Sequence, residues 1–207
     1  MSSIDLGIDT FGDITADADG RLKSHAQVLR DVLAEAELAD RLGIDFFGVG
    51  EHHRPDFAIS APEVVLAAIA SRTERIRLGT AVTVLSTDDP VRVYERFSTL
   101  DAVSGGRAEV ILGRGSFTES FPLFGYSLDD YEVLFEEKLA IFAALRDADR
   151  TGEPVRWKGT VRPPLDGLGP GGAGARCLDP ALGAEESRDR REDDHERLVR
   201  LRRSIAQ

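Results

Sequence analysis

The chain has 207 residues, of which 42% are hydrophobic, and a formal net charge of −11 at pH 7. This acidic balance excludes nucleic acid and anionic membrane surfaces as main partners, because both are bound by basic surfaces. No apolar run approaches the roughly 20 residues of a membrane span, and the first residues lack the basic and apolar regions of a signal peptide. The single cysteine, Cys177, cannot form an internal disulfide. We therefore expect a cytoplasmic protein.

Up to about residue 165, strand-like and helix-like segments alternate. Apolar and β-branched runs predict strands, and apolar residues at helical spacing predict helices that begin at Asp or Pro and end at Gly. In chain order the predicted elements are strand 4–11, helix 24–43, strand 44–50, helix 61–73, strand 76–85, helix 89–106, strand 108–116 and helix 128–147.

Four rounds of strand and helix predict a parallel sheet with helical crossovers. A doubly wound open sheet and a (β/α)8 barrel both fit this order. The first strand is not followed by the glycine pattern of a dinucleotide-binding turn. Polar residues and glycines instead gather at the carboxyl ends of several strands, where barrels build their sites. The predicted fold class is α/β, a partial (β/α)8 TIM barrel of about four strand–helix units.

Two blocks of sequence resemble a known family. They are "EHHRPDF" (51–57) and "RTERIRLGTAVTVLSTDDPVRVYERFSTLDAVSGGRAEVILGRGSF" (72–117). The shorter segments "TFGD" (10–13) and "ESFPLFGY" (119–126), together with the first block, resemble one oxidoreductase branch of the same family. From about residue 4 to 165 the chain resembles the amino-terminal half of the bacterial luciferase-like flavin-dependent monooxygenases. The resemblance implies a (β/α)8 barrel that binds reduced FMN, usually supplied by a separate flavin reductase. It also implies that dioxygen is used on a small-molecule substrate. A related branch uses a deazaflavin for hydride transfer.

The histidine pair that follows the second strand is the first candidate site. Histidine exchanges protons near neutral pH, and the resemblance places the catalytic histidine at His52. Neighbouring side chains of a strand point to opposite faces, so His52 and His53 cannot both line one pocket, whereas Glu51 and His53 share a side. The alternative is a solvated loop. A metal site is disfavoured because the other histidines, His25 and His195, are distant in sequence.

The end of the fourth strand is a candidate phosphate site. A phosphate needs a cation and small residues that let the backbone approach. Arg114 lies between two glycines, and the resemblance places the flavin-phosphate arginine there, with Gly115 and Ser116 beside it. The alternative is an ordinary surface arginine.

The resemblance also places a flavin-ring site at the third strand. It implies that Thr80, Ala81 and Val82 pass under the ring, with a cis peptide bond near Ala81–Val82. The alternative is a plain buried strand. The aromatic cluster 121–126 is either the wall of an apolar pocket or a plug that packs its loop onto the barrel.

From Asp166 the composition changes. Residues 166–207 contain 9 acids, 8 arginines and no aromatic residue, with a linker-like stretch at 169–175 and a possible charged helix over 185–204. We therefore divide the chain into a half-barrel at 1–165 and a tail at 166–207. A complete barrel needs about 250 residues, so we expect a truncation or an out-of-frame tail, disordered or helical, beginning near residue 168.

Three functions remain open at this point. The first is oxidation of a small organic substrate with reduced FMN and dioxygen, by a chain that is either active or inactive as truncated. The second is deazaflavin-dependent hydride transfer, and the third is a non-catalytic flavin-binding half-barrel that self-associates. Because unpaired parallel strand edges favour association, we expect a homo-oligomer.

Overall fold

The computed structural model describes residues 5–167, 182–184 and 199–203, and these form an α/β structure. The strands are β1 (Gly7–Thr10), β2 (Phe46–Val49), β3 (Arg77–Thr80), β4 (Thr83–Val84), β5 (Ala108–Gly113), β6 (Arg156–Trp157), β7 (Leu165–Asp166), β8 (Leu182–Ala184) and β9 (Val199–Arg203). The helices are α1 (His25–Leu42), α2 (Pro62–Ala70), α3 (Pro90–Ser104), α4 (Ser120–Phe124) and α5 (Tyr131–Thr151), with 3-10 turns η1 (Leu85–Thr87) and η2 (Leu128–Asp130).

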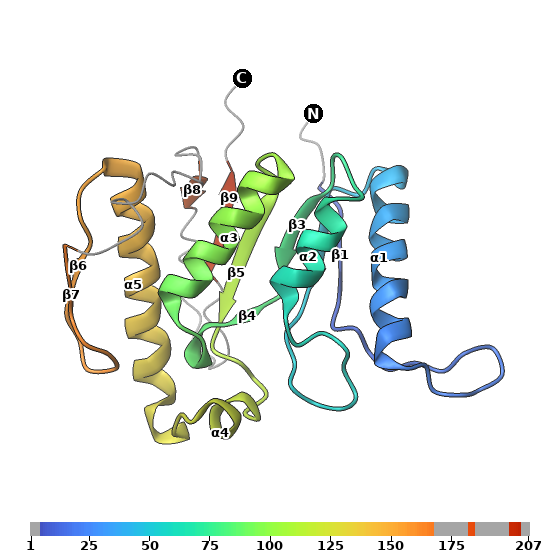
Figure 1. The fold of residues 1–207 in the computed structure, drawn as a ribbon, viewed down its shortest axis with the longest axis horizontal. Coiled ribbons are helices and arrows are strands. Elements are labelled where there is room, and N and C mark those ends of the chain that lie inside the picture. The colour runs from blue at the N-terminus through green and yellow to red at the C-terminus, as the bar shows by residue number, and fades with distance from the viewer. Residues whose placement is uncertain (1–4, 168–181, 185–198, 204–207) are drawn as a thin grey trace.

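The main sheet runs β1-β2-β3-β5-β9-β8, and its part β1-β2-β3-β5 is parallel. Its register pairs Gly7 with Phe46 and Phe46 with Arg77. Helices α1, α2 and α3 follow β1, β2 and β4 and cover one face of the sheet (Figure 1). The predicted strand–helix alternation is confirmed, and so is the α/β fold class.

One predicted strand is wrong in detail. The segment 76–85 was expected as one strand, but it is interrupted between β3 and β4. The interruption contains the Ala81–Val82 peptide bond, which is cis as the resemblance implied. Both parts pair with β5, since Leu78 lies opposite Ala108 and Thr83 lies opposite Leu112.

The helix ends follow from local chemistry. The Ser24 hydroxyl accepts the N–H three residues on, and Gly43 ends α1 at φ +81°, a region where a side chain is strained. Asp89 caps α3 as predicted, because its carboxylate accepts the N–H groups of Val91 and Arg92 at 2.9 and 3.1 Å. These caps fix where each helix begins relative to the sheet.

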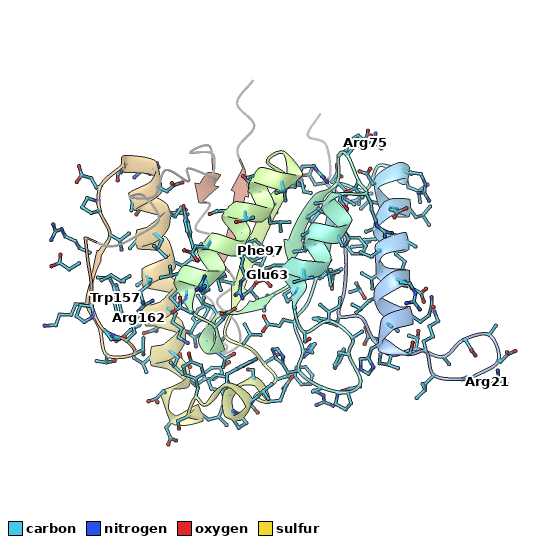
Figure 2. All side chains as sticks on the ribbon, in the orientation of Figure 1. Arg21, Glu63, Arg75, Phe97, Trp157 and Arg162 are labelled. Carbon is cyan, nitrogen blue, oxygen red and sulfur yellow. The ribbon has the colours of Figure 1, made fainter. Side chains whose placement is uncertain are left out.

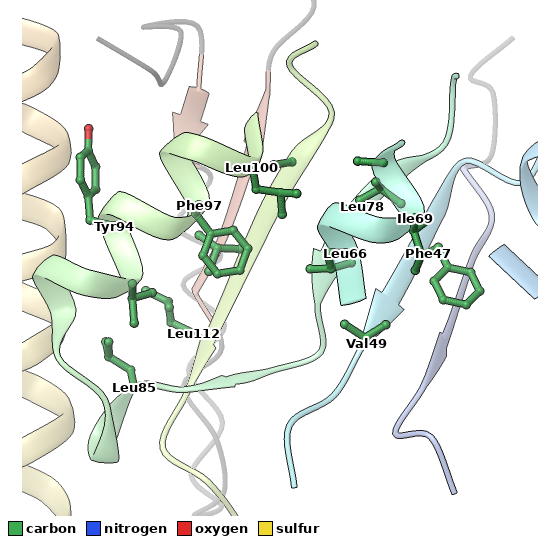
Figure 3. Close-up of a cluster of buried hydrophobic side chains, with 14 of the residues drawn as sticks. Phe47, Val49, Leu66, Ile69, Leu78, Leu85, Tyr94, Phe97, Leu100 and Leu112 are labelled. Atoms are coloured by element: carbon green, nitrogen blue, oxygen red, sulfur yellow. The ribbon is translucent and has the colours of Figure 1, made fainter. Parts of the chain in front are cut away.

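The core lies between the sheet and its helices (Figure 3). Alternate apolar side chains of each strand point toward the helices and pack against apolar side chains of α2 and α3. The side chains that meet there are fully buried or nearly so: Phe47, Val49, Leu66, Ile69, Leu78, Phe97, Leu100 and Leu112. This packing sets the positions at which the strands end.

Two polar residues tie together the turns at the amino-terminal end of the sheet. The buried Asp40 carboxylate of α1 accepts the N–H groups of Glu74, Arg75 and Ile76 at 3.1, 3.0 and 2.7 Å. Figure 2 labels Arg75 at this end, beside the tip of α2. Burial alone would raise the pKa of Asp40, but the three N–H donors outweigh it and lower that pKa below its usual value.

Arg107 is the second of these residues. Its guanidinium donates to the carbonyl oxygens of Ala70, Thr73 and Ile76 at 2.9, 3.0 and 2.9 Å. One side chain therefore satisfies backbone groups at the end of α2 and at the start of β3. Without it these buried carbonyls would lose their partners, which is costly.

The charged helix predicted over 185–204 is wrong over 199–203. These residues form β9, which pairs antiparallel with β5, Leu201 opposite Val110, and β8 pairs with β9 in turn. Val199 and Leu201 alternate with arginines, a period of two that suits a strand, and β5 otherwise ends the sheet with unpaired backbone groups. The linker-like stretch 169–175 and the rest of the predicted helix, 185–198, lie outside the described residues.

Within the part of the chain that the structure describes, no helix has the length and apolar character to cross a membrane. The same residues contain no group of three or more His, Cys, Asp or Glu side chains arranged to hold a metal ion.

Candidate functional site at the carboxyl ends of the strands

The candidate residues are brought to one end of the sheet. Strands β2, β3 and β5 are parallel, so the segments that follow them, 51–53, 81–82 and 114–116, all leave at the carboxyl end. This is the lower end of the sheet in Figure 1, where α4 also lies. The predicted site residues thus share one end of the fold.

His52 is enclosed by aromatic rings. Only 8% of the residue is exposed, which excludes the solvated-loop alternative for this histidine. Its ring stacks on Phe57 at 4.2 Å between centroids, meets Phe117 edge-on at 4.7 Å and tilts against Phe11 at 5.0 Å. Its Nδ1 lies 3.4 Å from the Oε1 atom of Glu119.

His53 has different partners. Its Nε2 lies 2.9 Å from Oε1 of Glu51, and its ring meets Phe124 edge-on at 4.9 Å. The other oxygen of Glu51 accepts the N–H of Val84 at 2.9 Å. The two histidines therefore contact different groups, although they follow β2 rather than belong to it, and Glu51 joins the end of β2 to β4.

The segment that follows β3 presents small apolar side chains. A Cβ atom on Gly48 of β2 would come 3.2 Å from the Cβ of Ala81, and one on Gly113 of β5 would come 2.5 Å from Val82. The neighbouring strands thus leave room for both side chains. The Thr80 hydroxyl instead bridges to β5, since it donates to the carbonyl of Ile111 at 3.2 Å.

Arg114 is mostly buried and already has partners. Its guanidinium forms an ion pair with Glu132 of α5 and lies 5.2 Å from the ring centre of Phe135. Gly115 has φ +84°, and a Cβ there would approach Val84 to 2.8 Å, so only glycine fits. Ser116, the next residue, is exposed. An ordinary surface arginine would be exposed, whereas the Arg114 side chain is mostly buried against α5.

Within the aromatic cluster 121–126, the packing role is observed for Phe121, and the pocket-wall role stays a prediction. Phe121 is fully buried and stacks on Tyr131, with 5.5 Å between ring centres, so it plugs α4 onto α5. Leu123 and Phe124 remain exposed at the same end of the sheet. Phe124 also touches His53, so the exposed apolar side chains border the histidine pair.

Lys138 is a residue that the sequence analysis missed. It lies on α5 with only 4% of its surface exposed. Its ammonium donates to the carbonyl of Ser86 at 2.6 Å and lies 3.9 Å from the ring centre of Tyr126. Burial lowers the pKa of Lys138 to about 8, although Asp88 and Asp89 oppose the shift. A lone lysine among the apolar positions of the predicted helix 128–147 was the available signal.

Comparison with known protein families identifies the family of the chain that carries this site. The family model described as luciferase-like monooxygenase matches residues 10–170. The chain belongs to this family. The resemblance seen in blocks 51–57 and 72–117 is confirmed.

Individual curated proteins match more than half of the chain. The chain is 36% identical over 125 residues to uncharacterized protein y4wF of Sinorhizobium fredii, covering 60% of the chain and 35% of that protein. It is 37% identical over 121 residues to 4-hydroxyprotoasukamycin monooxygenase of Streptomyces nodosus subsp. asukaensis, covering 58% and 32%. The chain thus spans about a third of the length of these relatives.

Solved luciferase-like structures share the fold. Monooxygenase RslO1 of Streptomyces bottropensis superposes with a TM-score of 0.67 at 30% identity, covering 80% of the chain and 49% of RslO1. A type II Baeyer–Villiger monooxygenase component of Pseudomonas putida, solved with FMN, has a TM-score of 0.66 at 20% identity, covering 79% and 44%. An F420-dependent secondary alcohol dehydrogenase has a TM-score of 0.62 at 20% identity, covering 79% and 47%. At 20% identity the likeness shows the fold alone.

The residues at the carboxyl end of the sheet fit a flavin. Ala81 and Val82 offer a small apolar surface to a flat ring, because Gly48 and Gly113 let that segment lie close to the sheet. Arg114 offers a cation to a phosphate, and Gly115 lets backbone approach. Glu132 opposes the phosphate, since it already neutralises this guanidinium.

Proposed function

We propose that the chain binds reduced FMN and serves the oxidation of a small organic substrate by dioxygen. The observation that carries the proposal is the burial of His52 among aromatic rings at the carboxyl end of the sheet. Membership of the luciferase-like monooxygenase family supports the reaction class. Because the chain spans about a third of its curated relatives, the complete activity is part of the proposal.

Each site residue has a proposed role. His52 exchanges a proton with the reacting group, and its aromatic surroundings exclude water, which strengthens electrostatic interactions there. Thr80, Ala81 and Val82 support the flavin ring, Thr80 through its link to β5. Arg114 holds the phosphate, with Gly115 and Ser116 beside it. The bound flavin supplies the electrons for the reaction with dioxygen.

A deazaflavin is the second candidate cofactor. The fold is shared with the F420-dependent secondary alcohol dehydrogenase as well as with the FMN-bound monooxygenase component. In that case the reaction is hydride transfer and needs no dioxygen. Separate titrations with reduced FMN and with reduced F420, followed by fluorescence, distinguish the two because only the true cofactor saturates at micromolar concentration.

Further parts of the proposal concern partners and organisation. A separate flavin reductase supplies the reduced cofactor, and the chain forms a homo-oligomer. Residues 1–165 act as the amino-terminal half of a luciferase-like barrel, and 166–207 as a distinct tail. The competing proposal is a non-catalytic flavin-binding half-barrel that self-associates. Such a protein would bind flavin equally well but would leave the reaction of the flavin with dioxygen unchanged.

The test is the reaction of the protein–flavin complex with oxygen. We expect the complex with reduced FMN, mixed with oxygenated buffer in a stopped-flow instrument, to reoxidise at a rate different from free reduced FMN. His52→Asn is expected to change that rate by at least about a hundredfold, the usual range for a lost proton-exchanging group. The affinity for reduced FMN should stay unchanged.

His25→Asn is the matched control, because His25 is exposed at the start of α1. It should leave both affinity and rate unchanged. If bound flavin reoxidises at the same rate in the unsubstituted protein, His52→Asn and His25→Asn, the proposed function is wrong and the non-catalytic half-barrel is favoured.

A further inference from the structure

We propose that Glu119 is a positioning residue that holds the His52 ring with its proton on Nδ1. The other ring nitrogen, Nε2, is then the atom that exchanges protons. The assignment of the proton to Nδ1 stands on geometry alone. The use of Nε2 in a reaction rests on the proposed function of His52.

The hydrogen bond between the two side chains determines the tautomer. His52 Nδ1 lies 3.4 Å from Oε1 of Glu119. An ionised carboxylate only accepts hydrogen bonds, so the neutral imidazole must carry its proton on Nδ1 to bond with it. A neutral imidazole has one N–H, and Nε2 is then left as the acceptor. Among the described residues no hydrogen-bond partner of Nε2 is found.

Three rings keep the imidazole in this orientation. Phe57 covers its face with an interplanar angle of 24°, and Phe117 meets it edge-on at 86°. Phe11 contacts it at 58°. A rotation of the imidazole about its own axis would have to displace these rings. None of the three phenylalanine rings carries a hydrogen-bonding group. Of the contacts of His52 named here, only the one with Glu119 therefore distinguishes the two ring nitrogens.

Glu119 comes from a distant part of the chain, 67 positions after His52. It directly precedes α4, whose Phe121 is buried against α5. The carboxylate is therefore carried on a packed segment rather than on a free loop. The neighbouring pair differs, because Glu51 lies 2.9 Å from Nε2 of His53 and not from its Nδ1. The two histidines are thus expected in opposite tautomers.

This difference gives an internal control for the experiment. Nitrogen-15 NMR of the 207-residue protein, labelled at its histidines and recorded above the titration range of the imidazoles, reports which ring nitrogen carries hydrogen. We expect His52 to show the Nδ1–H form and His53 the Nε2–H form in the unsubstituted protein. Free imidazole side chains favour Nε2–H, so an Nδ1–H signal from His52 requires a specific partner.

Two substitutions complete the test. Glu119→Leu removes the acceptor, and we expect the ratio of Nδ1–H to Nε2–H at His52 to fall about tenfold, the effect of losing one charge-assisted hydrogen bond. Glu51→Gln should leave the His52 ratio unchanged. The affinity for reduced FMN should be the same in both variants.

The proposal is overturned if His52 of the unsubstituted protein already shows the Nε2–H form, a result that needs no variant to fold. It is also overturned if Glu119→Leu folds and keeps the original ratio. A confirmed tautomer together with an unaltered flavin reaction in His52→Asn would support the positioning role and refute the proposed function, so the two failures are distinguishable.

Discussion

The ion pair between Arg114 and Glu132 determines how the candidate phosphate site is charged. The guanidinium is fixed between β5 and α5 by the carboxylate and the ring of Phe135. Glu132 is 64% exposed along its side chain, so it is free to move away. An incoming phosphate must compete with this carboxylate for the same cation. On the proposed role of Arg114, we therefore expect Glu132 to reduce the affinity for a phosphorylated ligand.

Removal of that charge should strengthen FMN binding. We expect Glu132→Gln to raise the affinity for FMN by about two- to fivefold, because an exposed ion pair has a small energy. Affinity for riboflavin, which lacks the phosphate, should not change. Fluorescence titration with both ligands measures the difference. Glu136→Gln, on the exposed side of the same helix, is the control, and an equal gain for riboflavin would contradict the assignment of Arg114 to phosphate.

Single residues of the site were predictable to different degrees. His52 and Arg114 lie in sequence blocks that resemble the family, so their place at strand ends followed from the predicted strands. Glu119 lies in the segment 119–126 that resembles the family, but its contact with His52 was not predictable, because the two residues are 67 positions apart. Glu132 likewise reaches Arg114 only through the fold. Side-chain partners across elements depend on packing that a single sequence does not reveal.

At the scale of elements, the position of α1 depends on its last turn. Asp40 lies near the end of α1, and its carboxylate accepts three N–H groups from the turn before β3. The helix is therefore attached to a strand that is not its neighbour in sequence. The attachment is buried, so its loss leaves donors without partners.

We expect Asp40→Ala to lower the free energy of unfolding by about 2–4 kcal/mol, because three buried donors lose their acceptor. Glu37 also lies on α1, and Glu37→Ala breaks its exposed ion pair with Arg72. This change should lower the free energy of unfolding by at most about 1 kcal/mol. Urea unfolding at neutral pH measures both. Equal small losses in the two variants would show that Asp40 does not attach α1 to β3.

The unsubstituted protein and Asp40→Ala should also differ in how their stability responds to acid. Folding lowers the pKa of Asp40, so its stabilisation is complete above the unfolded value of about 3.9 and is lost as pH falls through the lower folded value. The gap in stability between the unsubstituted protein and Asp40→Ala should therefore narrow below about pH 4. A gap independent of pH down to the unfolding transition would contradict this.

At the scale of the whole molecule, the order of elements was predictable and the ending was not. Strand and helix periods up to residue 165 gave the parallel sheet, because each element buries one face of a common core. The charged composition of 185–204 favoured a helix by side-chain pairing. Residues 199–203 instead pair with the edge of β5 through their backbone, and backbone pairing leaves little trace in composition.

The β9–β5 pairing has a testable consequence for association. Proline at position 201 lacks the N–H that a strand donates, so Leu201→Pro should remove β9 from the edge of β5. We expect a larger fraction of associated species by size-exclusion chromatography with light scattering. Ala206→Pro, beyond β9, is the control. An unchanged size distribution with Leu201→Pro would mean that β9 does not protect this edge.

Arg107 and Asp40 bind backbone at the amino-terminal end of the sheet, whereas His52, Arg114 and Glu119 lie at the opposite end. Mutations therefore have separate effects at the two ends. A substitution of His52 or Glu119 leaves the backbone contacts made by Asp40 and Arg107 intact. The end that carries the candidate site can therefore be altered experimentally while the opposite end keeps the helices attached to the sheet.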